Sequence, residues 1–232
     1  MTNVAIIVGG GVGKRFKRKI PKQFISVGGR PIIVHTTTGF DRCPSIDAIV
    51  VVVPEAWVAQ CTTDLEACSC QKVLDVIAGG ETRQMSCWQA LQYLRDSSPD
   101  TVVIHDAVRP LVTEKMIETA ISEGSKGMTF GFPAVDTLVE CEDRKIVEVL
   151  PRQGIYHVQT PQSFPFHVLW DAHCKALETG ITDASDDAGL VLMAGYTVKV
   201  VKGDPLNIKV TNPADVELVE HFLRQRRGCE DG

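Results

Sequence analysis

Short apolar runs alternate with amphipathic segments along most of the chain. Four of these runs have the composition of buried β-strands: Val4 to Val8, Ala48 to Val53, Val73 to Ala78 and Val102 to Ile104. Apolar residues recur at helical spacing between the runs, at Trp88, Leu91 and Leu94 and again at Ile117, Ala120 and Ile121. This alternation predicts an α/β fold with a mainly parallel, Rossmann-like sheet that is flanked by helices.

The pattern changes after Gly127. Two β-rich runs follow, at Pro133 to Glu140 and at Lys145 to Val149, and the polar turn Glu142-Asp-Arg144 separates them. Strand, turn and strand in this order predict a β-hairpin rather than another βαβ unit. We expect the hairpin, over residues 134–150, to protrude from the sheet as an arm.

The C-terminal third of the chain is predicted to contain two helices and one strand. A helix is expected over about Pro165 to Gly180, followed by an acidic loop and a strand at Thr197 to Val201. A last helix is expected to have Asn212 as its cap and Pro213 as its first residue. Because the chain shows no internal repeat or low-complexity linker, we expect a single domain over residues 1–232.

Composition narrows the class of protein. The chain has 232 residues, of which 44% are hydrophobic and 23% charged, in the range of globular proteins. Its 24 Lys and Arg against 29 Asp and Glu give a net charge of -5, so we expect no nucleic-acid partner. No apolar stretch approaches the roughly 20 residues of a membrane span, and we expect a cytoplasmic protein with no membrane partner. Its 8 cysteines lack metal-site spacing, which favours reduced thiols over a disulfide framework or zinc.

A glycine-rich segment, Val8-Gly-Gly-Gly-Val-Gly-Lys-Arg15, directly follows the first predicted strand. Glycines allow backbone amides to approach phosphate oxygens, so the segment suggests a phosphate-binding loop. A Walker A loop is excluded, because Val8 and Arg15 stand where that motif requires Gly and Ser or Thr. The dinucleotide fingerprint also fails, since Lys14 replaces its third glycine. A flexible glycine turn with solvated basic residues is the alternative.

A second segment, Ile104-His-Asp-Ala-Val-Arg-Pro110, lies at the carboxyl end of a predicted strand, where ligands bind in open α/β sheets. A carboxylate at Asp106 could orient a divalent metal or the attacking group near phosphates. Arg109 could instead bridge loops, and we expect His105 to pack rather than to catalyse.

Three later segments are weak signals when each is taken alone: Arg152 to Gln162 with its Thr160-Pro-Gln, Ser185-Asp-Asp-Ala188, and Asn207-Ile-Lys209-Val-Thr211. A Thr-Pro turn, a helix-capping Ser-Asp pair and a lysine at a strand end are common structural devices. Their order in one chain carries more weight.

Together the segments resemble the cytidylyltransferase family of the non-mevalonate isoprenoid pathway and its close relatives that make CDP-ribitol. The resemblance runs nearly end to end and rests on the following matches: Arg15 with Pro21-Lys22-Gln23, Gly79-Gly80-Glu-Thr-Arg83-Gln-Met-Ser86, His105 to Pro110, Arg152 with Thr160, and Lys209 within Asn-Ile-Lys-Val-Thr. It implies a fold of the nucleotide-diphospho-sugar transferase type and a reaction that joins CMP from CTP, the co-substrate, to a polyol phosphate.

The resemblance also implies roles for individual residues. Charge on the attacked phosphate would be balanced by Arg15, Lys22 and Lys209. CTP would be bound by Gly9, Gly10, Gly11, Gly13, Gly80, Arg83 and Ser86. The acceptor would be bound by Asp106, Arg109, Arg152, Thr160 and Ser185. Asp106 is expected to hold Mg²⁺ as well, and the hairpin is expected to form a homodimer.

The identity of the acceptor depends on smaller features. Residues 54–57 and 134–140 look more like the ribitol-phosphate branch, whereas residues 152–157 and 185–190 look more like the methylerythritol branch. We predict 2-C-methyl-D-erythritol 4-phosphate, with D-ribitol 5-phosphate as the alternative, because the segments nearest the expected acceptor pocket favour it. A sugar-nucleotide or molybdopterin-guanylyl enzyme for another base, or a non-catalytic nucleotide-binding protein, is the competing class.

Overall fold

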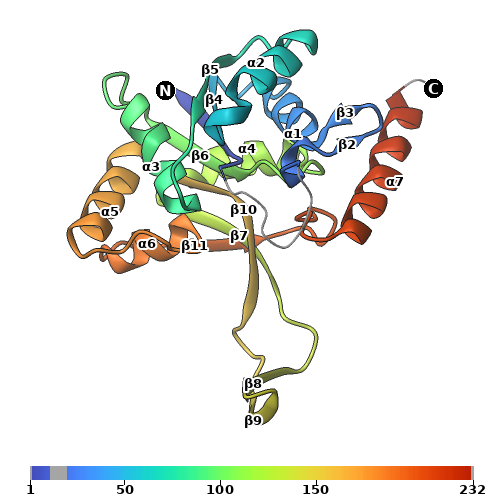
Figure 1. Cartoon of the computed structure of the whole chain (residues 1–232). Helices are drawn as coiled ribbons and strands as arrows, with labels where there is room; N and C mark the ends of the chain where they lie inside the picture. The colour runs from blue at the N-terminus through green and yellow to red at the C-terminus, as the bar shows by residue number, and fades with distance from the viewer. Residues whose placement is uncertain (1, 11–19, 231–232) are drawn as a thin grey trace.

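The computed structural model describes residues 2–10 and 20–230, and its central feature is a seven-stranded sheet (Figure 1). The strands lie in the order β11-β7-β10-β6-β1-β4-β5. Their bounds are β1 Asn3–Val8, β4 Ala48–Val53, β5 Val73–Ala78, β6 Thr101–Asp106, β7 Met128–Pro133, β10 Tyr156–Pro165 and β11 Lys199–Lys202. Within this sheet β10 runs antiparallel to both of its neighbours, and the other pairs that are hydrogen-bonded are parallel. The predicted α/β fold with a mostly parallel sheet is confirmed.

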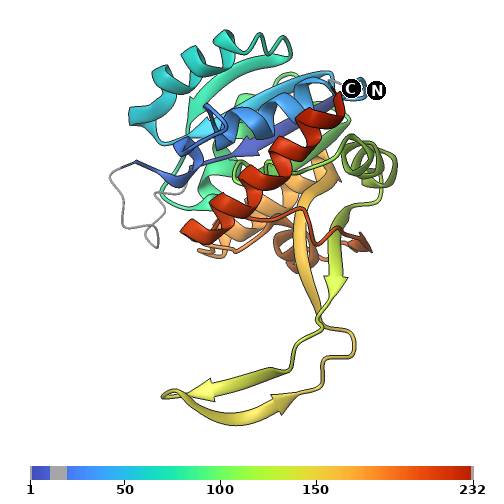
Figure 2. The ribbon, with the colours of Figure 1, turned by 90° about the vertical axis from the view of Figure 1, so that its right-hand side faces the viewer.

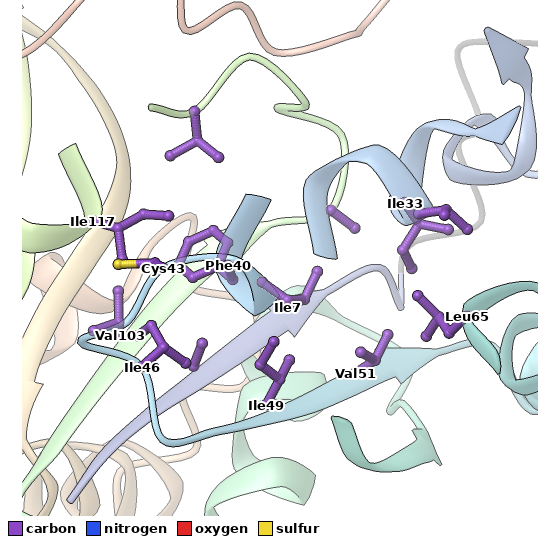
Figure 3. Packing of buried hydrophobic residues seen from close by; sticks show 14 of the residues in the cluster. Ile7, Ile33, Phe40, Cys43, Ile46, Ile49, Val51, Leu65, Val103 and Ile117 are labelled. Atoms are coloured by element: carbon purple, nitrogen blue, oxygen red, sulfur yellow. The ribbon is translucent and has the colours of Figure 1, made fainter. Parts of the chain in front are cut away.

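Helices cover both faces of the sheet, and the alternation of side chains along the strands explains why. One face packs against α1 (Ile32–Asp41), α2 (Val58–Ala67) and α4 (Glu114–Gly124). Figure 3 shows this core, in which Ile7, Ile49 and Val51 of the strands contact side chains of the helices. The other face packs against α3 (Arg83–Tyr93), α5 (Phe166–Glu178) and α6 (Asp187–Met193). Strands that are buried on both faces read as continuous apolar runs, which is why the sequence revealed them.

A third, smaller core lies under the last helix, α7 (Pro213–Glu230), which crosses the molecule in Figure 2. It joins Val219 of this helix to Val27 and Ile32 near the short strands β2 (Ser26–Val27) and β3 (Arg30–Pro31). The predicted cap is confirmed, because Asn212 Oδ1 accepts a 3.1 Å hydrogen bond from the backbone N–H of Asp215. Two 3₁₀ turns complete the described helices, η2 (Lys22–Phe24) and η3 (Glu55–Trp57).

The predicted hairpin is present and projects from the body of the protein (Figures 1 and 2). Its strands are β8 (Leu138–Glu142) and β9 (Lys145–Leu150), which pair antiparallel. Asp143 and Arg144 form the turn with φ angles of 47° and 65°. The first strand begins at Leu138 rather than at Pro133, because residues 134–137 leave the sheet as a connection.

Two other segments differ from the sequence-based expectation. The strand expected at 197–201 is β11 at Lys199–Lys202, a small shift in its bounds. The ten-residue strand β10 was not predicted, because its Thr160-Pro161-Gln162 sequence is typical of a turn. No helix within the described ranges is both long enough and apolar enough to span a bilayer.

Candidate active site

The candidate site lies where β1 and β6 end side by side. Chain direction in parallel strands brings their carboxyl ends to one edge, and Val8 pairs with Asp106 there. Two cavities open at this edge, of about 500 Å³ and about 130 Å³. Both are lined by Arg83, Asp106 and Lys209, so these three residues mark the junction between the cavities.

Asp106 is the electrostatic centre of the site, since three cations surround its buried carboxylate. Arg83 Nε lies 3.1 Å from Oδ1, while Lys209 Nζ and Arg109 Nε lie 2.8 Å and 3.4 Å from Oδ2. Burial alone would raise the pKa of this carboxyl, but the charges of Arg83, Lys209 and Arg109 hold the pKa well below its ordinary value. Asp106 is therefore a buried, ionised carboxylate that holds three cationic side chains together.

Thr160 and Asn207 tie three segments together behind Asp106. The backbone N–H of Asp106 donates to Thr160 Oγ1 at 3.0 Å, and Asn207 Nδ2 donates to the Thr160 carbonyl at 2.7 Å. Arg109 Nη1 in turn donates to the Asn207 carbonyl at 2.7 Å. Arg109 thus bridges two loops, which was the structural role considered for it from the sequence. It contacts Asp106 as well.

Arg83 stands at the first position of α3 and joins two buried carboxylates. The helix starts there because the Thr82 hydroxyl accepts from the backbone N–H of Met85 at 3.1 Å. Arg83 Nη1 lies 2.7 Å from Asp187 Oδ2, in addition to its contact with Asp106. Burial would lower the pKa of this guanidinium, but the nearby negative charges, Asp187 foremost, raise it well above its ordinary value. The sequence analysis assigned no role to Asp187, although the residue belongs to the Ser185-Asp-Asp-Ala188 segment, which was noted there.

Lys22 reaches the smaller cavity from the 3₁₀ turn η2. Its Nζ donates to the Val210 carbonyl at 3.0 Å, and the side chain of Gln23 donates to the Gly9 carbonyl. The Pro21-Lys22-Gln23 segment is thereby fixed both to the end of β1 and to the segment that carries Lys209. Lys22 and Lys209 line the same cavity.

Two predicted glycines allow close approach of the chain. A Cβ on Gly10 would lie 2.1 Å from Ser86 Oγ, and a Cβ on Gly80 would lie 2.5 Å from Met85 Cβ. Ser86 Oγ donates to the Thr82 carbonyl at 2.8 Å, which holds the hydroxyl beside Gly10. A side chain at position 10 would therefore push the end of β1 away from α3, and one at position 80 would push the β5–α3 connection away from that helix.

The remaining predicted residues fall into three groups. Ser185 lines the larger cavity together with Thr160. Arg152 lies at the base of the arm, two residues after its end, donates to the Val135 carbonyl at 2.5 Å and does not line either cavity of this chain. Gly9 lines the smaller cavity, while Gly11, Gly13 and Arg15 lie outside the described residues.

His105 is packed, as expected. Its Nε2 is 3.1 Å from the Arg109 carbonyl and its ring centroid is 5.0 Å from that of Phe40. Burial lowers its pKa to about 3, so the imidazole is neutral and holds the loop after β6.

Comparison with known proteins identifies the family. A family model described as 2-C-methyl-D-erythritol 4-phosphate cytidylyltransferase matches residues 3–225. The enzyme of that name from Thermotoga neapolitana is 36% identical, covering 96% of this chain and 97% of its own. The chain belongs to the 2-C-methyl-D-erythritol 4-phosphate cytidylyltransferase family. The predicted family and its nucleotidyltransferase class are confirmed.

Two further cytidylyltransferases extend the comparison. The crystal structure of the Thermus thermophilus enzyme superposes with a TM-score of 0.76 at 30% identity, over 95% of this chain and 98% of that one. A ribitol-5-phosphate cytidylyltransferase from Streptococcus agalactiae is 38% identical, over 93% of this chain and 92% of its own. The methylerythritol and ribitol branches are thus about equally similar to this chain in overall identity.

The donors around Asp106 can be tested against the needs of a Mg²⁺ ion in this cytidylyltransferase. Mg²⁺ is commonly bound by one or two carboxylates together with substrate phosphates and water. Among the described residues Asp106 Oδ1 accepts from Arg83, and because a carboxylate oxygen can accept twice, this oxygen has room for a second partner. Within the described part of the chain, no group of three or more His, Cys, Asp or Glu could form a protein-only cage. The site fits an ion that is shared with phosphates.

Proposed function

We propose that this chain transfers CMP from CTP to the phosphate of 2-C-methyl-D-erythritol 4-phosphate and releases pyrophosphate. The observation that carries the proposal is the cluster in which Arg83, Arg109 and Lys209 surround Asp106 at the junction of two cavities. Lys22 supplies a further cation to the smaller cavity. Such a concentration of fixed positive charge suits a triphosphate and an acceptor phosphate that must be brought together.

The reaction is one substitution at the α-phosphorus of CTP. A phosphate oxygen of the acceptor forms the new P–O bond while the bond to the β-phosphate oxygen breaks, and the electron pair leaves with pyrophosphate. The attacking oxygen is already ionised, so no side chain has to remove a proton. The protein's task is therefore to position two anions and to stabilise the charge of the transition state.

Lys22 and Lys209 are suited to that stabilisation because each is held by the backbone or by Asp106. Lys22 Nζ is held by the Val210 carbonyl, and Lys209 Nζ is held by Asp106. An ammonium group that is already oriented loses little further entropy when the phosphates arrive. We assign Arg15 the same role from its position after the glycine-rich segment.

We assign Mg²⁺ to Asp106, where it would neutralise charge on the triphosphate and on the departing pyrophosphate. The three cationic neighbours hold the pKa of the Asp106 carboxyl well below its ordinary value, so the group would offer an ionised oxygen to the metal. Arg83 orients Oδ1 from the other side.

The nucleotide is assigned to the smaller cavity and its border. Gly9 and Gly10 line that cavity, Ser86 of α3 adjoins Gly10, and Gly80 packs against Met85 just before that helix. Backbone at glycines can approach a ligand closely because no Cβ intervenes. Ser86 is fully buried and its hydroxyl donates to the Thr82 carbonyl beside Gly10, so we assign it the role of supporting the glycine backbone at this border.

The acceptor is assigned to the larger cavity, which Thr160 and Ser185 line. Its phosphate would be bound by Arg152 of a partner subunit, because Arg152 lies at the base of the arm and away from the cavities of its own chain. The arm supports this assignment with exposed apolar side chains, Val135 at 71%, Ile146 at 65% and Val149 at 63%. We therefore propose a homodimer in which each arm completes the other active site.

The ribitol branch supplies the second candidate acceptor, since the Streptococcus agalactiae relative is as similar as the methylerythritol relatives. The two acceptors differ in a methyl group and in chain length. A methyl group in an apolar niche contributes only about 1 to 3 kcal/mol, so partial cross-reactivity is expected.

The test is pyrophosphate release with each of the four ribonucleoside triphosphates and each of the two polyol phosphates. We expect CTP to be the preferred nucleotide and methylerythritol phosphate to have the higher kcat/KM. If ribitol phosphate is preferred about tenfold or more, the acceptor is wrong while cytidylyl transfer stands. No pyrophosphate from CTP with either acceptor would overturn the proposed function.

A further inference from the structure

A buried carboxylate and a buried imidazole lie behind Arg83, on the side away from Asp106. Asp187 Oδ2 is 2.7 Å from Arg83 Nη1, and Asp187 Oδ1 is 3.0 Å from His173 Nε2. The side chains of Asp187 and His173 are both fully buried, with 0% exposed. The four residues thus form a continuous chain of contacts, from His173 through Asp187 and Arg83 to Asp106.

Packing alone does not account for the imidazole at position 173. Its neighbours on the inner face of α5 are Leu169, Ala172 and Ala176, which belong to the apolar core of that side of the sheet. An apolar side chain of similar volume would fill such a position without the cost of burying polar atoms. His173 Nδ1 is in fact buried with no hydrogen-bond partner among the described residues. The contact of Nε2 with Asp187 is the feature that only a hydrogen-bond donor can supply.

That contact fixes the rotation of the Asp187 carboxylate. A carboxylate accepts, so His173 Nε2 donates to Oδ1 and leaves Oδ2 directed at Arg83. The backbone N–H of Asp187 donates to Gln162 Oε1 at 3.1 Å, which fixes the start of α6. Trp88 lies nearly parallel to the imidazole, with an interplanar angle of 11° and ring centroids 6.1 Å apart. Both the carboxylate and the ring are therefore held in one orientation.

Arg83 transmits this orientation to the active site. Its Nη1 faces Asp187 while its Nε faces Asp106, so a rotation of the guanidinium to suit one carboxylate changes its contact with the other. The planar group keeps these two directions in a fixed relation. Displacement of Asp187 would consequently move the donor that orients Asp106 Oδ1.

We propose that His173 and Asp187 are positioning residues for nucleotide binding, which act by holding Arg83 in the orientation that aligns Asp106. The proposal rests on the proposed function and adds two residues to it. Neither residue lines the two cavities, so the effect is indirect. Indirect support of this kind around a catalytic group typically changes affinity or activity about 10- to 100-fold when it is removed.

The experiment compares His173→Leu with His173→Gln. Leucine fills the apolar surroundings but has no donor, whereas glutamine carries an N–H donor at about the reach of Nε2. We expect His173→Leu to lower kcat/KM for CTP about tenfold, and His173→Gln to stay within about threefold of the wild type. The KM for the acceptor phosphate should rise as well in His173→Leu, because Arg83 and Asp106 also line the larger cavity and the Asp106 backbone N–H donates to Thr160. A second readout is the rise in Tm produced by CTP and Mg²⁺, which should shrink in His173→Leu and persist in His173→Gln.

Leu169→Val serves as the matched packing control. Leu169 lies on the same helix and in the same apolar core, and the substitution should lower Tm without changing kcat/KM for CTP.

Asp187→Asn tests the carboxylate that lies between His173 and Arg83. If His173 acts through Asp187, the double variant His173→Leu with Asp187→Asn should be no more impaired in kcat/KM than Asp187→Asn alone.

Three results would overturn the inference: wild-type kcat/KM in His173→Leu, equal impairment of the leucine and glutamine variants, or independent losses in the double variant. If His173→Leu does not fold, the comparison of Asp187→Asn with His173→Gln decides, since the inference requires the first to be impaired and the second not. A wild-type protein that releases no pyrophosphate from CTP would instead contradict the proposed function. In that case the CTP-dependent Tm shift still tests whether these residues support nucleotide binding.

Discussion

Lys209 Nζ lies 2.8 Å from Asp106 Oδ2, and the two side chains differ sharply in exposure, at 39% and 7%. The buried carboxylate is fixed by two arginines as well, whereas the lysine has one face open to the cavities. We therefore expect Lys209 to turn toward an incoming phosphate while Asp106 stays in place. In the proposed function, the ion pair would hold this cation in position before the substrates bind.

Replacement of Asp106 should remove the centre of this arrangement. Asp106→Asn keeps the volume but leaves Arg83, Arg109 and Lys209 without their shared anion, so they should separate. We expect kcat/KM to fall at least about a hundredfold, corresponding to about 3 kcal/mol of transition-state stabilisation. Asp96→Asn, at an exposed position beyond α3, is the matched control and should remain fully active. Steady-state pyrophosphate release measures both, and a near-normal Asp106→Asn would exclude the assigned role.

Lys22 should matter for turnover far more than for folding. Its side chain lines the smaller cavity, and its ammonium group donates to the Val210 carbonyl at 3.0 Å. A preorganised cation that faces the transferring phosphate can supply several kcal/mol, so Lys22→Ala should lose at least about a hundredfold in kcat. Lys126→Ala, at an exposed position after α4, should behave as wild type. Circular dichroism and Tm should show that both variants are folded. If Lys22→Ala then has the same kcat as Lys126→Ala, Lys22 does not stabilise the transition state.

The close approach of Gly10 to Ser86 predicts a coupled pair of substitutions. Because a Cβ at position 10 would lie 2.1 Å from Ser86 Oγ, Gly10→Ala forces that hydroxyl to leave its hydrogen bond with Thr82. We expect a loss of about 1 to 3 kcal/mol in the free energy of unfolding. The same substitution in a Ser86→Ala background should cost about 1 kcal/mol less, because the clashing atom is gone. Urea unfolding of the four proteins gives the coupling energy, and strict additivity would show that the two sites do not meet.

If the arm forms the proposed dimer interface, a single charged side chain introduced on it should weaken the dimer. Val149 is 63% exposed and pairs directly with Val139 across the hairpin, which gives the arm an apolar surface. Val149→Asp should place a charge in the proposed interface at a cost of about 2 kcal/mol or more. Light scattering at micromolar concentration should then show a dimer for the wild type and increased monomer for the variant.

The same variant should lose activity if Arg152 acts on the partner's acceptor. Glu148→Gln, at the neighbouring position on β9, is the control and should remain dimeric and active. A wild-type monomer with full activity would contradict both the dimer and the exchanged role of Arg152.

The lowered pKa of Asp187 leads us to expect that its contribution to the free energy of unfolding depends on pH. Burial would raise the pKa of its carboxyl, but Arg83 and the hydrogen bond from His173 lower the pKa below that of the unfolded chain. The stabilisation is therefore fully present above the unfolded pKa, about 4, and is lost as the pH falls toward the lowered folded value. The difference in unfolding free energy between wild type and Asp187→Asn should be constant from about pH 7 to pH 5 and should shrink below about pH 4. Urea unfolding across this range measures it, and a difference that grows on acidification would reverse the assigned sign.

The sequence alone was sufficient for many of the local elements and for the family, although it did not reveal β10. Strands buried on both faces, such as Ala48–Val53, appear as unbroken apolar runs, and the cap at Asn212 follows from local hydrogen-bonding chemistry. The hairpin was visible because a polar turn separates two β-rich runs. These features depend on residues that are close together in the chain, so each segment carries its own signal. The ordered set of motifs added the family and its chemistry.

Only the tertiary structure decided which side chains meet. Asp106 gains its partners from three separate segments, and Thr160 proves to hold the backbone of Asp106 besides lining a cavity. The sequence offered no reason to single out Asp187 or His173, because their partners lie on other helices. A buried charge depends for its stability on whichever groups packing brings within about 3 Å, and that distance is set by the whole fold rather than by spacing along the chain.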